Sequence, residues 1–408
     1  MKTTLSAIVT LLLVSACLDQ SLDACTVAVV SGKCTRDGRP LLWKHRDTDK
    51  LQNALMYFQG GKYSFIGLID AADSLRENVW VGCNSAGFAI MNSASYNLIL
   101  NDTVKVRDRE GIVMRMALER CATIEEFEAL LRELSKPLGV EANFGVIDAS
   151  GGAAFFEVAN YAWSKLDVND PAVAPFGYLL HTNFSFTGDP LRGAGHIRYA
   201  TAEELFHEGY ETDGITPQFI LQNASRCLKH SLTRVDLRTE CGASSAERKF
   251  VPFEDFIPRF ITSASVVIQG VRPHESPDLT TMWTILGFPL TSVVTPVWIG
   301  GGNALPLLLT LGKNSVAPLC DKAMKLKESL FPIRRSYGER YLNINAAFNG
   351  AGTGTMQRLR PLEDQIFQEA ASKLGEWRRG KLKKSEIAEF YRWMDETITA
   401  EYQRLYGL

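Results

Sequence analysis

Cys25 follows a short apolar leader that ends at Ala24, so removal of the leader would make a cysteine the first residue of the mature chain. A free α-amino group titrates near pH ~8 and an unperturbed thiol near about 8.5. An N-terminal cysteine therefore carries a nucleophile and its own general base within hydrogen-bond reach. The sequence predicts that Cys25 is a catalytic nucleophile, and the alternative is a buried or disulfide-bonded cysteine near an exported N-terminus.

Residues 1–24 have the features of a signal peptide, with a positive charge at Lys2, an apolar stretch and then small residues. The apolar stretch is too short to span a membrane. The cleavage site is ambiguous. Val14-Ser15-Ala16-Cys17 resembles a bacterial lipobox, whereas Leu22-Asp23-Ala24 places a leucine where signal peptidase I prefers a small residue.

Lipid attachment at Cys17 is the favoured alternative for this leader. It would leave residues 18–24 as a short propeptide, so that the Ala24–Cys25 bond would be cut in a second step. Either route predicts an extracytoplasmic protein, periplasmic or secreted, with no membrane attachment beyond a lipid anchor at Cys17.

The composition of the chain argues against several classes of function. The net charge is −2, and no basic block with interleaved aromatic residues indicates a nucleic-acid partner. None of the six histidines pairs with another ligand at zinc spacing, so we predict no metal and no other cofactor. The apolar region 292–311 is broken by prolines and glycines, which predicts a buried strand and loop. A Cys227–Cys241 bridge is one open alternative among irregularly spaced cysteines.

The pattern of apolar residues predicts strands in the first part of the chain and helices between and after them. A hairpin is expected from residues 26–31 and 41–44, joined by the turn Asp37-Gly38-Arg39-Pro40. Thr123-Ile124-Glu125-Glu126 has the form of a capping box at the start of a helix. Further strands are expected at 79–83, 88–92, 144–148 and 153–158, and helices at 110–121 and 123–134 and within 358–408.

Because strands and helices come in blocks without strict alternation, the sequence predicts an α+β fold. No long linker or internal repeat interrupts residues 25–408. We therefore expect a single domain over 25–408, with a helical C-terminal extension at about 355–408 after the leader of residues 1–24.

An N-terminal nucleophile needs a carboxylate to orient the α-amine, a cation near that carboxylate, and amide groups to bind an oxyanion. Lys44-His45-Arg46-Asp47 lies at the end of the second hairpin strand, where it would fold back beside Cys25. With Cys25-Thr26 and Asp37-Gly38, this segment resembles the opening of the N-terminal-nucleophile (Ntn) amide hydrolases of the choloylglycine hydrolase and penicillin V acylase group. Acid ceramidase and isopenicillin-N acyltransferase open similarly, with Arg-Asn-x-Asp in the last position.

The resemblance implies a role for Asp47 in contacting the α-amine and for Lys44 in steadying Asp47. Lys44 stands where the relatives have arginine and His45 where they often have asparagine. A lysine cannot reproduce the bidentate fork of a guanidinium. This departure weakens the analogy to the bile-salt enzymes.

Two later segments extend the resemblance to about residue 200. Asn84-Ser85-Ala86-Gly87-Phe88-Ala89-Ile90-Met91-Asn92 is similar to the family's Asn-x-x-Gly-Leu-Ala segment, which implies that Asn92 helps to bind the oxyanion. His181-Thr182-Asn183-Phe184 resembles the family's Thr-Asn, whose asparagine lies over the nucleophile, which implies that Asn183 helps Asn92 to stabilise the oxyanion. Arg192 and Arg198 are both candidates for the family's active-site arginine, and Arg198 is preferred for its local context.

The resemblance implies a four-layer αββα sandwich of two antiparallel sheets and hydrolysis of a linear carboxamide through a thioester acyl-enzyme. The expected partner is a small-molecule N-acyl amide, such as an N-acyl amino acid or a bile-acid conjugate, and a homo-oligomer stays an open alternative. Apolar residues in 56–65 are candidates for an acyl pocket or for the core. The alternative functions are an N-terminal-cysteine dipeptidase, an acyltransferase, and a lipoprotein that only binds a ligand.

Overall fold

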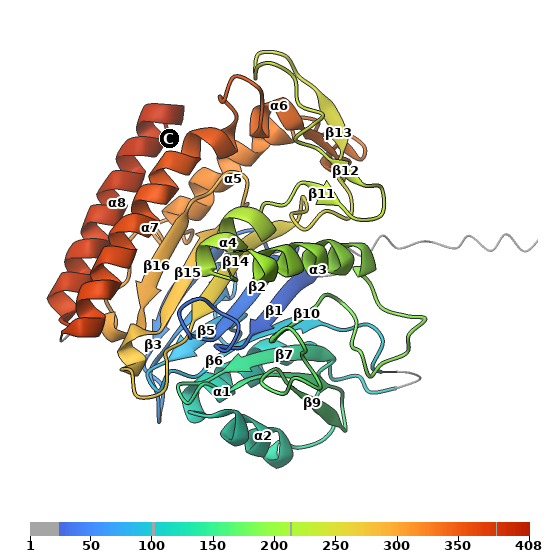
Figure 1. The fold of residues 1–408 in the computed structure, drawn as a ribbon, viewed down its shortest axis with the longest axis vertical. Helices are drawn as coiled ribbons and strands as arrows, with labels where there is room; N and C mark the ends of the chain where they lie inside the picture. Colours follow the sequence, from blue (N-terminus) through green and yellow to red (C-terminus); the bar gives the residue numbers. More distant parts are fainter. Residues whose placement is uncertain (1–23, 100–102, 213, 381) are drawn as a thin grey trace, which may run out of the picture.

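The computed structural model describes residues 24–99, 103–212, 214–380 and 382–408. The leader and Cys17 lie outside these residues. Two antiparallel sheets form the centre of the fold (Figure 1). The six-stranded sheet has the order β10–β1–β2–β14–β15–β16. Its strands are β1 Cys25–Val30, β2 Leu41–Asp47, β10 Tyr178–His181, β14 Thr262–Gln269, β15 Thr281–Leu286 and β16 Val294–Trp298.

The seven-stranded sheet runs in chain order from β3 to β9, so each strand pairs with the strand before it. Short turns join several of these strands, whereas a long segment that contains two helices connects β6 to β7. The strands are β3 Asn53–Phe58, β4 Phe65–Asp70, β5 Val81–Asn84, β6 Ala89–Ala94, β7 Ala142–Ile147, β8 Ala153–Val158 and β9 Trp163–Asp167.

The two sheets pack face to face, with β1 and β2 of one sheet against β6 and β7 of the other. A close approach occurs at Gly145 in β7. A Cβ added there would lie 2.2 Å from Met91 Cε and 2.8 Å from Val29 Cγ2. Glycine at this position therefore lets Val29 of the first sheet and Met91 of the second pack over the same backbone.

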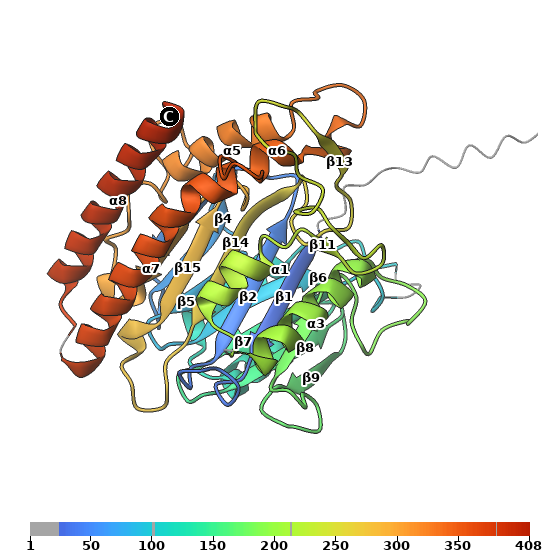
Figure 2. The same cartoon turned by 45° about the horizontal axis from the view of Figure 1, so that its top comes forward.

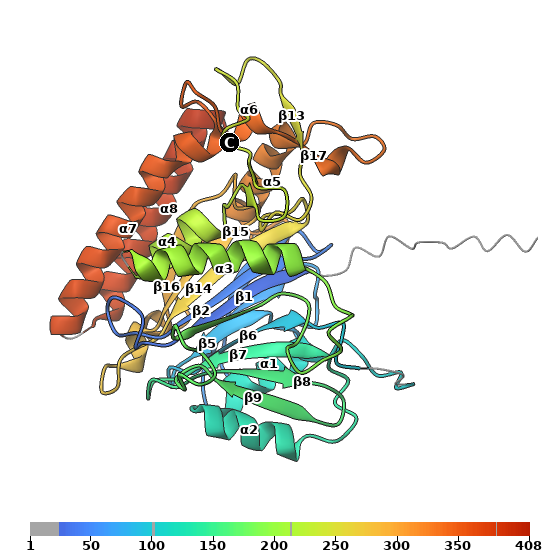
Figure 3. The same ribbon diagram turned by 45° about the vertical axis from the view of Figure 1, so that its right-hand side comes forward.

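Helices cover the outer faces of both sheets and complete the predicted four-layer αββα sandwich. On the six-stranded sheet lie α3, α4, the π-helical turn η1 and α7, with α8 packed on α7 (Figure 2). On the outer face of the seven-stranded sheet lie α1 and α2 (Figure 3). The bounds are α1 Glu110–Arg120, α2 Ile124–Glu133, α3 His196–Glu211, α4 Pro217–Phe219, η1 Ile220–Ala224, α7 Thr355–Arg379 and α8 Lys384–Tyr406.

A smaller apolar cluster packs beside the sandwich, around α5 and residues 228–256. The elements of this part of the chain are α5 Pro318–Leu330, α6 Ile344–Ala347, β11 Lys229–His230, β12 Val235–Asp236, β13 Phe250–Pro252 and β17 Tyr341–Asn343. Short 3-10 turns occupy Pro277–Leu279, Ile299–Gly301 and Gly338–Arg340.

The predicted hairpin that begins at Cys25 is confirmed, and its second strand continues three residues further, to Asp47. The cap of α2 is also confirmed, since Thr123 Oγ1 accepts a hydrogen bond from Glu126 N at 3.2 Å. The return bond differs from the expected one, because Glu126 accepts from Ala122 N.

The apolar region 292–311 forms the edge strand β16 and a following loop, as the sequence predicts. Pro296 is tolerated in β16 because an edge strand needs ladder bonds on one side only. Within the described parts of the chain, no helix combines the length and apolar character that a bilayer crossing requires. All the cysteines there are free, so Cys227 and Cys241 form no bridge.

Candidate active site

Cys25 lies in the wall of a cavity of about 670 Å³. The cavity opens where the start of β1 and the end of β2 meet the end of β6 and the loops around residues 106–110 and 139–141. Cys25, Lys44, Asp47 and Asn92 all contribute to its lining. The fold therefore brings four of the six predicted site residues to one cavity.

The register of the β1–β2 hairpin explains this arrangement. Cys25 pairs with Arg46, and Val27 pairs with Lys44. Directly opposed residues of an antiparallel pair point to the same face of the sheet. Cys25, Lys44 and Arg46 therefore share the face that meets the second sheet.

Arg198, in the first turn of α3, joins the beginning of β1 to the segment that follows β10. Its guanidinium donates hydrogen bonds to Cys25 O at 2.8 Å, to Thr26 Oγ1 at 2.9 Å and to Asn183 Oδ1 at 2.8 Å. Burial lowers the pKa of Arg198, and the nearby Asp47 carboxylate opposes this shift. The other candidate, Arg192, is exposed and lies 3.6 Å from Asp189 in an ion pair.

Asn183 is fully buried behind Cys25 and presents its amide oxygen to the Cys25 backbone nitrogen at 3.2 Å. Its Nδ2 donates to Ala94 O at 3.0 Å. The donor from Arg198 on one side and the acceptor Ala94 O on the other fix the orientation of this amide. The structure therefore corrects the role expected for Asn183. Its oxygen accepts from the nitrogen of the nucleophile residue, and its Nδ2 is already used elsewhere.

Lys44 holds Asn92. The Lys44 Nζ donates to Asn92 O and to Asn92 Oδ1, both at 2.6 Å. Because Lys44 holds the Asn92 oxygens, the Asn92 Nδ2 is left as the donor on the side chain of a residue that lines the cavity with Cys25. This geometry suits the predicted oxyanion role of Asn92.

Asp47 contacts two residues that the sequence interpretation did not single out. Its Oδ1 accepts from Thr262 Oγ1 at 2.6 Å, and its Oδ2 lies 3.8 Å from the Arg259 guanidinium. These contacts come from the segment 259–262, before and at the start of β14, and the expectation that Lys44 steadies Asp47 stays a prediction. Asp47 still lines the cavity with Cys25, as its predicted role requires.

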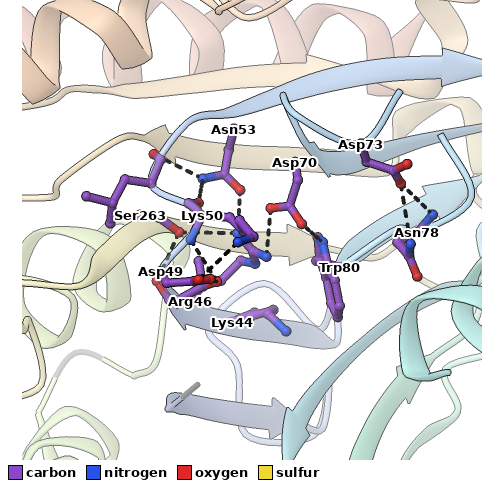
Figure 4. A network of polar contacts seen from close by, with 12 residues as sticks. Lys44, Arg46, Asp49, Lys50, Asn53, Asp70, Asp73, Asn78, Trp80 and Ser263 are labelled. Atoms are coloured by element: carbon purple, nitrogen blue, oxygen red, sulfur yellow. Dashed lines mark hydrogen bonds and ion pairs between the residues drawn. The ribbon is translucent and has the colours of Figure 1, made fainter. Parts of the chain in front are cut away.

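Arg46 is a cavity residue that the sequence interpretation did not single out. Its guanidinium lies 2.9 Å from Asp70 Oδ1, donates to Asn53 Oδ1 at 2.6 Å, and stacks 4.9 Å from the ring centroid of Trp80 (Figure 4). Trp80 in turn donates to Asp70 Oδ2 at 2.9 Å. The alternation of β2 gives the signal that could have identified Arg46, because it lies two residues from Lys44 on the same face.

His45 points to the opposite face of β2, towards the helical layer. It lies near Trp43, whose ring stacks on Phe206 of α3. Burial and the charge of Arg198 lower the pKa of His45 to about 3, so the imidazole is neutral at pH 7. His45 is therefore a packing residue of the strand and lies away from the Cys25 side.

The apolar segment 56–65 belongs to the core of the second sheet. Phe58 and Phe65 stack with their centroids 4.6 Å apart, and both are buried. The lining of the cavity at Cys25 instead includes carboxylates, among them Glu110 and Glu141. Burial raises the pKa of Glu110 to about 7. Within the described residues, no group of three or more His, Cys, Asp or Glu side chains is arranged to hold a metal ion.

Residues 35–212 match the model of the acyl-coenzyme A:6-aminopenicillanic acid acyl-transferase family. This match confirms the resemblance to the Ntn hydrolases that the N-terminal motifs predict. A search of curated proteins finds no match.

Several solved structures are similar to the chain. An N-acylethanolamine-hydrolyzing acid amidase ortholog of Caenorhabditis elegans is 17% identical, covers 62% of this chain and 92% of its own, and gives a TM-score of 0.41. A variant of the conjugated bile acid hydrolase of Clostridium perfringens is 11% identical, with coverages of 68% and 93% and a TM-score of 0.42. A penicillin V acylase of Agrobacterium tumefaciens is 13% identical, with coverages of 68% and 86% and a TM-score of 0.38.

The two asparagines should give different kinetic signatures. Asn92→Ala should lower kcat by about 10²–10³ at every pH with a smaller change in KM, because an oxyanion donor acts mainly in the transition state. Asn183→Ala should instead shift the acidic limb of the pH–rate profile to lower pH. It removes an acceptor that favours the protonated α-amine and leaves the Arg198 charge nearby.

The measurement is a pH profile of amide hydrolysis for wild type and both variants. If kcat instead fell equally at every pH in Asn183→Ala and stayed near normal in Asn92→Ala, Asn183 would be the oxyanion donor and Asn92 would not.

Proposed function

We propose that this chain is an exported N-terminal-cysteine amidohydrolase that cleaves a linear carboxamide through a thioester acyl-enzyme. The observation that carries the proposal is the environment of the Cys25 backbone nitrogen. It donates to Asn183 Oδ1 at 3.2 Å, beside Arg198 and at the wall of a cavity. Removal of Ala24 would convert this peptide nitrogen into an α-amine next to the Cys25 thiol.

In the proposed mechanism the α-amine takes up the thiol proton, directly or through one water, and the thiolate attacks the carboxamide carbon. Asn92 Nδ2 donates to the developing oxyanion. Asn183 and Asp47 hold the α-amine, which then gives its proton to the leaving amine. Water hydrolyses the thioester and regenerates Cys25. If an amine replaced that water, the same site would act as an acyltransferase, in keeping with the family that residues 35–212 match.

The proposed substrates are N-acyl amides with a small polar amine, such as N-acyl amino acids or bile-acid conjugates. A second candidate, dipeptide hydrolysis, is favoured by carboxylates in the lining of the cavity. Glu110, Glu141 and Asp108 line it and could attract the ammonium group of a dipeptide. The alternative outside enzymes is a lipoprotein that binds a ligand and in which Cys25 has no chemical role.

The thiol of Cys25 should be required for activity. Cys25→Ala should abolish amide hydrolysis, and Cys25→Ser should greatly reduce it. Iodoacetamide should label Cys25 ahead of the thiols whose pKa is raised, because the thiolate is the reactive form. Burial raises the pKa of those thiols, to about 12 for Cys34, Cys83, Cys121 and Cys320 and to about 11 for Cys227.

Labelling is followed by peptide mass spectrometry in a Cys241→Ser background, because Cys241 is only partly buried and would compete. Unchanged turnover in the alanine variant would remove the nucleophile assignment.

The active form should begin at Cys25. If the leader is first cut at Cys17, the Ala24–Cys25 bond should be cleaved by the Cys25 thiol itself, which can attack the carbonyl of Ala24. Ala24 is buried next to this cavity residue, where an external protease has little access. Intact mass should then show residues 18–24 retained in Cys25→Ala and absent from wild type. Normal removal of this segment in the variant would contradict autocatalysis.

N-acyl glycines should be cleaved faster than free dipeptides in a panel that also contains bile-acid conjugates and penicillin V. Glu110→Gln tests the dipeptidase alternative directly, because it removes a carboxylate from the lining of the cavity and leaves Cys25 unchanged. We expect this variant to hydrolyse N-acyl glycines nearly as well as wild type. A wild-type preference for dipeptides that is lost in Glu110→Gln would instead identify a dipeptidase.

A further inference from the structure

A second cavity, of about 540 Å³, lies beside α5 and shares no lining residue with the cavity at Cys25. The segment 48–52 separates the two, since Thr48 and Asp49 line the first cavity and Leu51 and Gln52 line the second. This volume falls in the range of about 300–1,000 Å³ that is usual for small-molecule sites. Its apolar lining consists of Leu51, Phe260, Met324, Phe331 and Ile333.

Lys327 of α5 lines this cavity although its side chain is only 3% exposed. Its Nζ donates to Phe260 O and lies 3.8 Å from the Phe260 ring centroid, with the rings of Phe288 and Phe331 at 5.1 and 6.0 Å. An ammonium group has three N–H donors. Among the described residues only Phe260 O accepts a hydrogen bond from this one, and no carboxylate lies within ion-pair distance of it, although the charge of Asp47 acts on it from further away. Burial accordingly lowers the pKa of Lys327 to about 7.

Gln52 provides a second polar group without a partner in the same cavity. Its Oε1 is buried and accepts no hydrogen bond from any described residue. The charged residues of the rim are largely matched to one another. Lys325 lies 2.7 Å from Asp321, and Arg334 lies 2.5 Å from Glu328. The unmet polar groups are therefore inside the cavity, on Lys327 and Gln52, while its rim is close to neutral.

We propose that this cavity binds a monocarboxylic acid with an apolar tail. The ligand carboxylate would accept hydrogen bonds from Lys327 Nζ and from the Nε2 amide group of Gln52, which is the donor end of that side chain. The tail would pack against Phe260, Phe331 and Met324. Such a ligand supplies the direct ion pair that this buried ammonium lacks, and it covers apolar surface that is now only partly enclosed. The proposal does not depend on which amide is hydrolysed at Cys25.

The test uses octanoate as the probe and the full-length protein labelled with ¹³C at its methionine methyl groups. Titration should shift the Met324 resonance and give a dissociation constant. Lys327→Met should weaken binding about tenfold or more, which corresponds to one charge-assisted hydrogen bond. The matched control Lys322→Met removes a lysine of the same helix that does not line the cavity, and it should bind like wild type. Octanol, which lacks the carboxylate, should bind more weakly than octanoate.

A cavity-filling variant, Met324→Trp, keeps Lys327 and should also weaken binding, measured by calorimetry. This variant keeps the test decisive if Lys327→Met does not fold. Equal binding of octanoate by wild type and Lys327→Met, equal binding of octanol and octanoate, or full binding by Met324→Trp would each overturn the proposal.

Discussion

The buried guanidinium of Arg198 is the interaction on which the arrangement of the candidate site depends. Its hydrogen bonds end on Cys25, Thr26 and Asn183, which belong to two different strands or their ends. Burying a charge without such hydrogen bonds costs roughly several kcal/mol of folding free energy. The positions of Cys25, Thr26 and Asn183 are therefore coupled to one another through Arg198. Arg198 of α3 therefore fixes the position of the first residues of β1. The same guanidinium orients the amide of Asn183.

A second constraint ties the two sheets together at the cavity. Arg46 belongs to the first sheet, and its partner Asp70 ends a strand of the second. Trp80 covers both, because it stacks on the guanidinium and donates to the carboxylate. Lys44 makes a similar connection through Asn92. Polar contacts between the sheets are thus concentrated next to Cys25 and at the pair of His181 in β10 and Glu157 in β8, which lie 2.8 Å apart, while much of the remaining interface is apolar.

The sequence predicts what is encoded locally and misses what depends on distant pairing. Alternation and turn residues predicted the hairpin at Cys25 and the cap at Thr123, and the local context of Arg198 separated it from Arg192. The partners of Asp47 were out of reach, because Thr262 lies 215 residues away and only the β2–β14 pairing brings it near. The same holds for the contact between Lys44 and Asn92, which lie 48 residues apart in the sequence. Side chains of similar type compete for one contact, and only the three-dimensional register decides between them.

The proposed chemistry makes activity depend on cleavage before Cys25. His45, the histidine nearest in sequence, faces the helical layer and lies away from the thiol. In the uncleaved chain the nitrogen of Cys25 is a peptide nitrogen, which has no basicity to offer, although it already donates to Asn183 Oδ1. Loss of Ala24 adds an amine lone pair at a position that the fold has already fixed. Processing would therefore create the general base without any rearrangement of the site.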